Sequence, residues 1–311
     1  MEAFPDRLVA TIQRKGCPIS VGLDPRLDLM PPSLVQGHFA RHGYTHHAAS
    51  LAIRDFNLRL LDALAPHVPA VKVQVAFYEA FGPPGMRVFA ETLLAARQRE
   101  LIVIADVKRG DIEMTAKAYA TAYLGSSLPS VTLAPGFDVD AITVNPYLGG
   151  DGVLPFVDAA KAHGKGIFVL VKTSNPTSGD LQDLLVDGIP VYERIASRVW
   201  QWGHGTEGQT GYQAVGAVVG ATYPAEAAQL RDLMPQTYFL LPGYGAQGAQ
   251  AEDVRACFNP DGYGALVNSS RAIIFAYRRE TYGSFGEARF AQAAEAAVLA
   301  MKHDLNVVLR P

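Results

Sequence analysis

Residues 101–111 read LIVIADVKRGD, an apolar run that passes directly into alternating acidic and basic residues. An apolar run of this length is typical of a buried parallel strand. Because side chains alternate along a strand, we expect Asp106 and Lys108 to point to the same side. Charges are costly to bury unless they are paired, so the pattern favours a preorganised electrostatic site. A structural salt bridge at the strand end is the plainer alternative.

The same pattern recurs on both sides of this stretch. Short apolar runs are each followed by a polar or Gly/Pro-rich turn and then by a helical pattern, which is typical of βα units. The predicted strands are Ile19–Leu23, Ala70–Val75, Leu101–Ala105, Ala141–Val144, Gly166–Val171, Ala214–Val219, Tyr238–Leu241 and Gly264–Val267. The predicted helices are residues 1–15, Ala52–Leu64, Arg87–Gln98, Glu193–Trp202, Ala225–Leu233 and Gly286–Met301. About eight units favour an α/β protein with a (β/α)₈ TIM barrel over an open, doubly wound sheet.

No linker or low-complexity tract divides the chain, so we expect a single barrel domain over residues 1–311. The longest irregular stretches are Asp28–Ser50, Thr173–Gly188 and Gly203–Gly211. We interpret them as insertions or active-site loops, because long loops inside a compact domain are usually functional. The barrel is therefore expected to carry extended loops after strands 1 and 5.

Composition excludes several classes of protein. A net charge of −3 gives no basic field for nucleic acid or an anionic membrane. The two cysteines, Cys17 and Cys257, allow neither a disulfide framework nor a Cys-based zinc site. No signal peptide or membrane span is apparent. We therefore expect a cytoplasmic protein that binds neither nucleic acid nor membrane.

A histidine cluster invites a metal-site interpretation, because His38 and His42 have the spacing of one helical face. Gly37, Gly43 and the preceding prolines argue against a continuous helix there. A polar surface loop that also holds His46 and His47 is the favoured interpretation, and no metal is expected.

Charged residues gather at further strand ends: Asp24 ends the first predicted strand and Lys72 lies in the second. In a barrel these ends meet on one face, which strengthens the functional interpretation. After the last two strands come PGYGAQG at residues 242–248 and NSSR at residues 268–271. A glycine-rich loop alone is often only a turn. Together with Arg271 and its place after the last two strands, it favours phosphate binding, because these loops form the recurrent phosphate site of such barrels. A phosphorylated small molecule is the expected ligand.

These motifs, together with VGLDP at residues 21–25, VKVQ at residues 71–74 and DVKRGDI at residues 106–112, resemble the orotidine 5′-phosphate decarboxylase family in its longer bacterial form. The resemblance spans nearly the whole chain. It implies a carboxy-lyase that converts orotidine 5′-phosphate to uridine 5′-phosphate and carbon dioxide, the last step of de novo pyrimidine nucleotide biosynthesis. It implies no metal and no organic cofactor.

The resemblance also assigns roles to individual residues. Lys72, Asp106, Lys108 and Asp111 would form the catalytic charged network, with Lys108 as counter-ion and proton donor to C6 and Asp106 next to the substrate carboxylate. The protein would be a homodimer in which Asp111 and Thr115 reach into the partner's site. The substrate-binding residues would be Asp24, Lys72, Thr115, Ser174, Gln247 and Arg271. For the pyrimidine contact, Ser174 competes with three other hydroxyls, those of Thr173, Thr177 and Ser178.

Two other functions are compatible with the pattern. A magnesium-dependent sugar-phosphate lyase or decarboxylase resembles this chain around the Asp-x-Lys-x-x-Asp motif, but Lys72 would repel the metal. A non-catalytic barrel that binds a phosphorylated ligand is the alternative from a different class.

Overall fold

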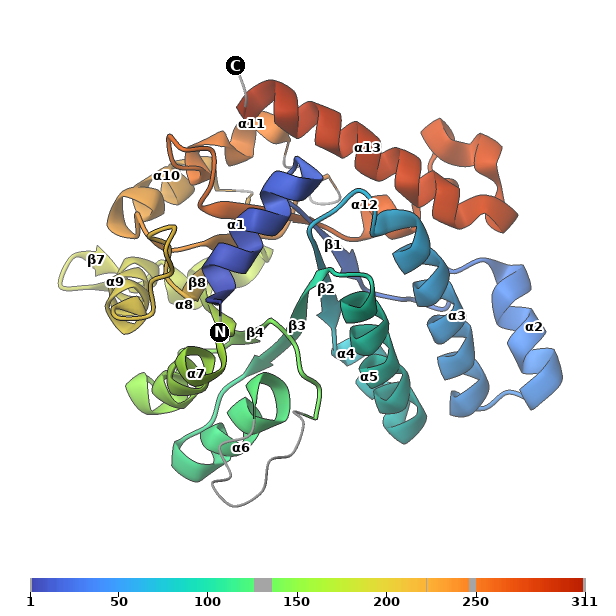
Figure 1. Cartoon of the computed structure of the whole chain (residues 1–311), viewed down its shortest axis with the longest axis horizontal. Helices are drawn as coiled ribbons and strands as arrows, with labels where there is room; N and C mark the ends of the chain where they lie inside the picture. Colours follow the sequence, from blue (N-terminus) through green and yellow to red (C-terminus); the bar gives the residue numbers. More distant parts are fainter. Residues whose placement is uncertain (1, 126–135, 222, 246–249, 310–311) are drawn as a thin grey trace.

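Eight parallel strands close into a barrel in the computed structural model, which describes residues 2–125, 136–221, 223–245 and 250–309 (Figure 1). Their order around the barrel is β1-β10-β9-β8-β5-β4-β3-β2. The first strand pairs with both β2 and the last strand, β10, which closes the ring. The predicted TIM barrel is therefore confirmed, and the open doubly wound sheet is excluded.

The elements have the following bounds. The barrel strands are β1 (Ile19–Leu23), β2 (Ala70–Gln74), β3 (Ile102–Arg109), β4 (Ala141–Val144), β5 (Gly166–Lys172), β8 (Val215–Val219), β9 (Phe239–Leu241) and β10 (Ala265–Ser269). The helices are α1 (Phe4–Lys15), α2 (Pro32–His42), α3 (His46–Leu64), α4 (Ala76–Glu79), α5 (Gly82–Gln98), α6 (Glu113–Leu124), α7 (Gly150–His163), α8 (Gly179–Gln182), α9 (Val191–Gly203), α10 (Pro224–Leu233), α11 (Ala251–Val254), α12 (Arg271–Ile274) and α13 (Phe290–Leu309). The hairpin strands are β6 (Leu185–Val186) and β7 (Ile189–Pro190).

Each predicted strand coincides with an observed one, and the clearest difference is at β3. The strand was expected to end at Ala105, but it continues to Arg109. Backbone groups make the ladder of hydrogen bonds, so charged side chains at the mouth of a barrel do not by themselves end a strand. The last helix also differs: it begins at Phe290 rather than Gly286 and runs to Leu309.

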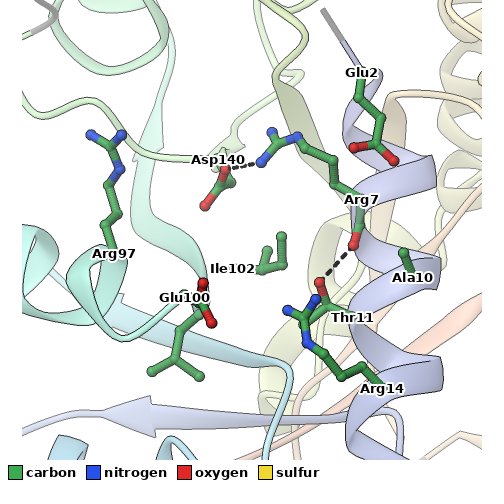
Figure 2. Close-up of a pocket in the computed structure, with 10 residues that line it drawn as sticks. Glu2, Arg7, Ala10, Thr11, Arg14, Arg97, Glu100, Ile102 and Asp140 are labelled. Carbon is green, nitrogen blue, oxygen red and sulfur yellow. Dashed lines mark hydrogen bonds and ion pairs between the residues drawn. The ribbon is translucent and has the colours of Figure 1, made fainter.

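Helix α1 closes one end of the barrel (Figure 1). Its buried Phe4 and Leu8 pack against inward-facing side chains of the strands, and the rings of Phe4 and Phe168 lie edge to face with centroids 6.0 Å apart. Arg7 points from the helix toward Asp140, with 2.5 Å between Nη1 and Oδ1 (Figure 2). These contacts join α1 to the start of β4 and leave the opposite, carboxyl end of the barrel for a site.

The expectation of an irregular stretch over Asp28–Ser50 is wrong in large part. Residues 32–42 form α2, and α3 begins at His46 behind Thr45, whose hydroxyl accepts from Ala48 N at 3.1 Å. Pro32 lies in the first turn of α2, where its missing N–H costs nothing. Helix α2 tolerates Gly37 in its interior because it packs on α3.

The predicted polar loop for the four histidines is wrong for the same reason, since two lie on α2 and two on α3. His38 is buried and its Nε2 lies 2.9 Å from Asp55 Oδ2 of α3. No group of three or more His, Cys, Asp or Glu within the described ranges is placed to hold a metal ion.

The stretch Thr173–Gly188 is also more ordered than expected. It contains a 3₁₀ turn at Pro176–Ser178, helix α8 and most of the hairpin that pairs β6 with β7. None of the helices in the described part of the chain has the length and apolar character needed to cross a membrane.

Candidate active site

The carboxylate of Asp106 is the centre of a buried hydrogen-bond network at the carboxyl end of the barrel. Its Oδ2 accepts from Lys72 Nζ at 2.8 Å and from Gln74 Nε2 at 2.9 Å. Its Oδ1 accepts from Lys108 Nζ at 2.7 Å and from the Thr143 hydroxyl at 2.9 Å. Three adjacent strands, β2, β3 and β4, supply these groups, so the barrel itself holds the network in place.

The network keeps its buried charges. Burial raises the pKa of Asp106. The ammonium groups of Lys72 and Lys108 lower it by more than burial raises it, so the pKa lies well below the ordinary value. Burial lowers the pKa of Lys72, but the carboxylates of Asp106 and Asp24 raise it, and the net pKa lies above the ordinary value. Asp106 and Lys72 therefore form an ion pair in which both groups keep their charge.

Asp24 stands at the edge of this network. Its Oδ1 lies 3.5 Å from Lys72 Nζ, within ion-pair distance. The same oxygen is buried and makes no hydrogen bond with the residues that the structure describes. The side chain is 19% exposed, so its other carboxylate oxygen, Oδ2, is the one that a ligand hydroxyl can reach.

A local break in β3 aims the Lys108 side chain. The pairing of β3 with β4 shifts register between Ala105 and Arg109, and Lys108 has a φ of 44°, which is uncommon for a residue with a side chain. The Thr143 hydroxyl oxygen accepts from the N–H groups of Val107 at 3.0 Å and Lys108 at 2.9 Å. The predicted meeting of Asp106 and Lys108 is confirmed, but through this bulge and not through regular alternation.

A cavity of about 430 Å³ opens beside the network. Lys72, Asp106, Lys108 and Thr143 form its charged and polar wall, and Leu170, Val218 and Leu240 contribute apolar side chains. The remaining lining residues are Thr173, Ser174, Asn175, Gln182 and Pro242. The Lys108 side chain is 46% exposed and reaches this space. Such a cavity suits a planar ring with polar edges.

The four candidate hydroxyls after β5 are now separated. Ser174 and Thr173 line the cavity, whereas Thr177 and Ser178 do not. The Thr173 hydroxyl already donates to Asn175 Oδ1 at 2.6 Å. The Ser174 hydroxyl makes no hydrogen bond with any residue of the described ranges, which favours it as the ligand contact.

The predicted phosphate side is built around Arg271, which lines a second cavity of about 310 Å³ with Gly245, Ala272 and Arg279. Gly245 has a φ of 74°, a conformation that favours glycine. Two guanidinium groups on one cavity suit a dianion. The other predicted phosphate ligand, Gln247, lies outside the described residues.

Asp111 and Thr115 do not join the network of their own chain. Neither lines the cavity beside Lys108. Asp111 is half-buried and its Oδ1 accepts from Ile112 N at 2.8 Å, and Thr115 is exposed on α6. Their predicted role across a dimer interface stays a prediction.

Several site residues were missed from the sequence. Thr143 is a polar residue inside the apolar run Ala141–Val144, and Gln74 lies two residues after Lys72, so both carried a signal. Gln182 and Arg279 had no such sequence signal, because only the folding of the loops brings them to the two cavities.

Comparisons with known proteins cover most of the chain. Residues 19–282 match the model of the "Orotidine 5′-phosphate decarboxylase / HUMPS family". An orotidine 5′-phosphate decarboxylase of Rhodopirellula baltica is 45% identical over 98% of this chain and 100% of its own length. One from Caldicellulosiruptor saccharolyticus is 38% identical over 92% and 94%. The solved OMP decarboxylase of Leishmania donovani superimposes with a TM-score of 0.71 at 30% identity, covering 97% of this chain and 99% of its own.

Proposed function

The chain belongs to the orotidine 5′-phosphate decarboxylase / HUMPS family, and from this premise we propose that it decarboxylates orotidine 5′-phosphate to uridine 5′-phosphate. It is a carboxy-lyase of pyrimidine biosynthesis. The observation that carries the proposal is Asp106 held between Lys72 and Lys108 on the wall of the 430 Å³ cavity.

Lys108 is the proposed counter-ion and proton donor. Loss of carbon dioxide leaves negative charge at C6 of the pyrimidine, and a nearby ammonium group stabilises that charge more than it stabilises the substrate. The Lys108 ammonium group is partly exposed to the cavity while its hydrogen bond to Asp106 fixes its position. It therefore needs little reorganisation during the reaction.

Asp106 is proposed to lie next to the substrate carboxylate. Its low pKa keeps it ionised, so a second carboxylate brought beside it raises the energy of the bound substrate. This repulsion disappears once carbon dioxide leaves. Lys72 holds Asp106 in place through its hydrogen bond. Lys72 and Asp24 are proposed to bind the ribose hydroxyls.

The remaining contacts bind the ends of the nucleotide. Ser174 is proposed to contact the pyrimidine, because the residue lines the cavity and its hydroxyl is left without a partner among the described residues. Arg271 is proposed to bind the phosphate, together with Gln247. Binding energy from the remote phosphate can then serve the chemical step.

A homodimer is part of the proposal, with Asp111 and Thr115 contributed to the partner's site. Large apolar side chains are exposed next to them in the sequence, Ile112 at 48% and Met114 at 74%. Clustered apolar side chains of this size on a surface are typical of a protein interface.

A metal-dependent lyase reaction is disfavoured by Lys72. Its ammonium group lies 2.8 Å from Asp106 and 3.5 Å from Asp24, where it would repel a divalent cation bound to those carboxylates. The ammonium groups of Lys72 and Lys108 together balance the charge of the two carboxylates.

The test follows the ultraviolet absorbance of orotidine 5′-phosphate with purified, EDTA-treated protein. Wild-type protein should decarboxylate the substrate, and Lys108→Ala should abolish turnover while binding of uridine 5′-phosphate stays measurable. Near-native activity of Lys108→Ala would refute its role. Tight product binding by a wild-type chain without turnover would instead favour a non-catalytic binding protein, and loss of turnover on EDTA treatment would favour the metal-dependent lyase.

A further inference from the structure

A second buried lysine, Lys172, lies at the carboxyl end of β5, next to the segment that lines the cavity. Its side chain is 2% exposed. Its ammonium group lies 5.0 Å from the ring centroid of Tyr192 and 4.9 Å from that of Tyr223. Tyrosine faces attract a cation, but they do not neutralise it. A buried ammonium group of this kind requires a carboxylate.

That carboxylate comes from the loop after β5. Asp183, directly after α8, forms an ion pair with Lys172 through its Oδ1. A Cβ atom on Gly179 would approach within 2.7 Å of Asp183 Oδ2, so the glycine leaves room for this side chain. The side chain of Asp183 is 52% exposed, so its position depends on the loop being docked.

A neighbouring pair of residues makes a second connection between the same two points. Gln182 Oε1 accepts from Thr173 N at 2.9 Å, and Gln182 Nε2 donates to the Thr173 hydroxyl at 2.8 Å. Residues 172 and 173 are thus joined to residues 183 and 182. We name these two connections the clasp.

The clasp encloses the residues that face the ligand. Ser174 and Asn175 line the cavity, and both lie between the two ends that the clasp joins. On the outer side, a Cβ atom on Gly220 would lie 3.1 Å from the Ser174 Cα atom, so the barrel wall fits closely against this segment. Movement of the segment is therefore limited from both sides.

We infer that Lys172 and Asp183 are positioning residues that hold Ser174 and Asn175 against the pyrimidine ring of the substrate. The inference rests on the proposed function and adds to it the residues that set the geometry of the pyrimidine contact. Without Asp183, the Lys172 ammonium group is left unpaired among apolar groups and tyrosine rings. The loop must then open to let water reach it, and the pyrimidine contacts move with the loop.

The test compares two ligands that differ only in the base. Uridine 5′-phosphate carries the pyrimidine, whereas ribose 5-phosphate keeps the sugar and the phosphate. We expect Asp183→Ala to weaken binding of uridine 5′-phosphate about tenfold, within the range found for coupled neighbours, and to leave ribose 5-phosphate binding unchanged. KM for orotidine 5′-phosphate should rise in parallel.

Asp180→Ala is the matched control, since Asp180 is an exposed aspartate of α8 that makes no ion pair with any described residue. It should bind both ligands like the wild type. Lys172→Met removes the same ion pair but leaves no buried charge, so it should weaken binding of uridine 5′-phosphate less than Asp183→Ala does. The double variant should bind uridine 5′-phosphate no more weakly than Asp183→Ala does.

Unchanged binding of uridine 5′-phosphate by Asp183→Ala would overturn the inference, as would an equal loss of affinity for ribose 5-phosphate. Should Lys172→Met fail to fold, the half-exposed Asp183 still provides the decisive variant. A wild-type chain that does not decarboxylate orotidine 5′-phosphate would refute the proposed function itself. If the wild type decarboxylates orotidine 5′-phosphate but Asp183→Ala binds uridine 5′-phosphate as tightly as the wild type, the positioning role of the clasp is refuted and the proposed function stands.

Discussion

Thr143→Val is the most direct test of how the charged network is held. Valine keeps the β-branched shape of threonine inside β4, so the packing of this side chain, which is 1% exposed, is preserved. The change removes one hydrogen bond to Asp106 Oδ1 and the acceptor for two backbone N–H groups, those of Val107 and Lys108. The carboxylate and the bulge that aims Lys108 lose their common support.

The size of the effect follows from these bonds. A hydrogen bond to a charged group contributes about 1.5–3 kcal/mol, and 1.4 kcal/mol corresponds to a factor of ten in rate. Because Asp106 keeps its bonds to Lys72, Lys108 and Gln74, we expect the lower end of this range, about a tenfold fall in kcat/KM. Leaving the two N–H groups without an acceptor costs about 1–3 kcal/mol each, so the free energy of unfolding should fall by about 2–6 kcal/mol.

The assay is the loss of absorbance from orotidine 5′-phosphate, with urea unfolding of the same preparations. Thr143→Ser is the matched control, because it keeps the hydroxyl and loses only a methyl group. It should retain a kcat/KM close to that of the wild type. A folded Thr143→Val with kcat/KM within about twofold of wild type would refute the reasoning, as would a serine variant as impaired as the valine variant.

Three further predictions concern the rest of the site. Arg271→Ala should raise KM for orotidine 5′-phosphate about tenfold or more, because it removes a charge-assisted contact to the phosphate. An unchanged KM in steady-state kinetics would count against that contact. Lys108→Ala and Asp111→Ala subunits should each be inactive alone, but unfolding and refolding them together should restore about a quarter of the wild-type activity. Half of the resulting dimers are mixed, and each mixed dimer has one intact site out of two. No recovery of activity would argue against a site shared between subunits. The folded-state pKa of Asp106 lies below its ordinary value of 3.8, so the stability that Asp106 contributes is complete above pH 3.8 and is lost as the pH falls through the folded-state pKa. Lys72→Met should raise the folded-state pKa of Asp106 and move this loss of stability to higher pH in urea unfolding measured between about pH 2 and pH 6. An unshifted pH profile would contradict the coupling between Lys72 and Asp106.

The sequence by itself determined the barrel and the centre of its site. Apolar runs followed by helical patterns are local features, and each of the eight predicted strands coincides with an observed one. Parallel strands of a barrel place their carboxyl ends on one face, so charged residues at those ends meet whatever the details of packing. This is why Lys72, Asp106 and Lys108 could be placed in one site beforehand.

Only the tertiary structure decided how those charges are held. The hydrogen bond from Thr143 to Asp106 depends on the register between β3 and β4 and on a bulge that no periodicity encodes. The ion pair between Lys172 and Asp183 depends on how a loop folds back onto the strand before it. Helix α2 was missed because its glycine and proline weaken the local signal, while its packing on α3 stabilises it. Contacts between residues distant in sequence follow from the packing of the whole chain, and local patterns do not record them.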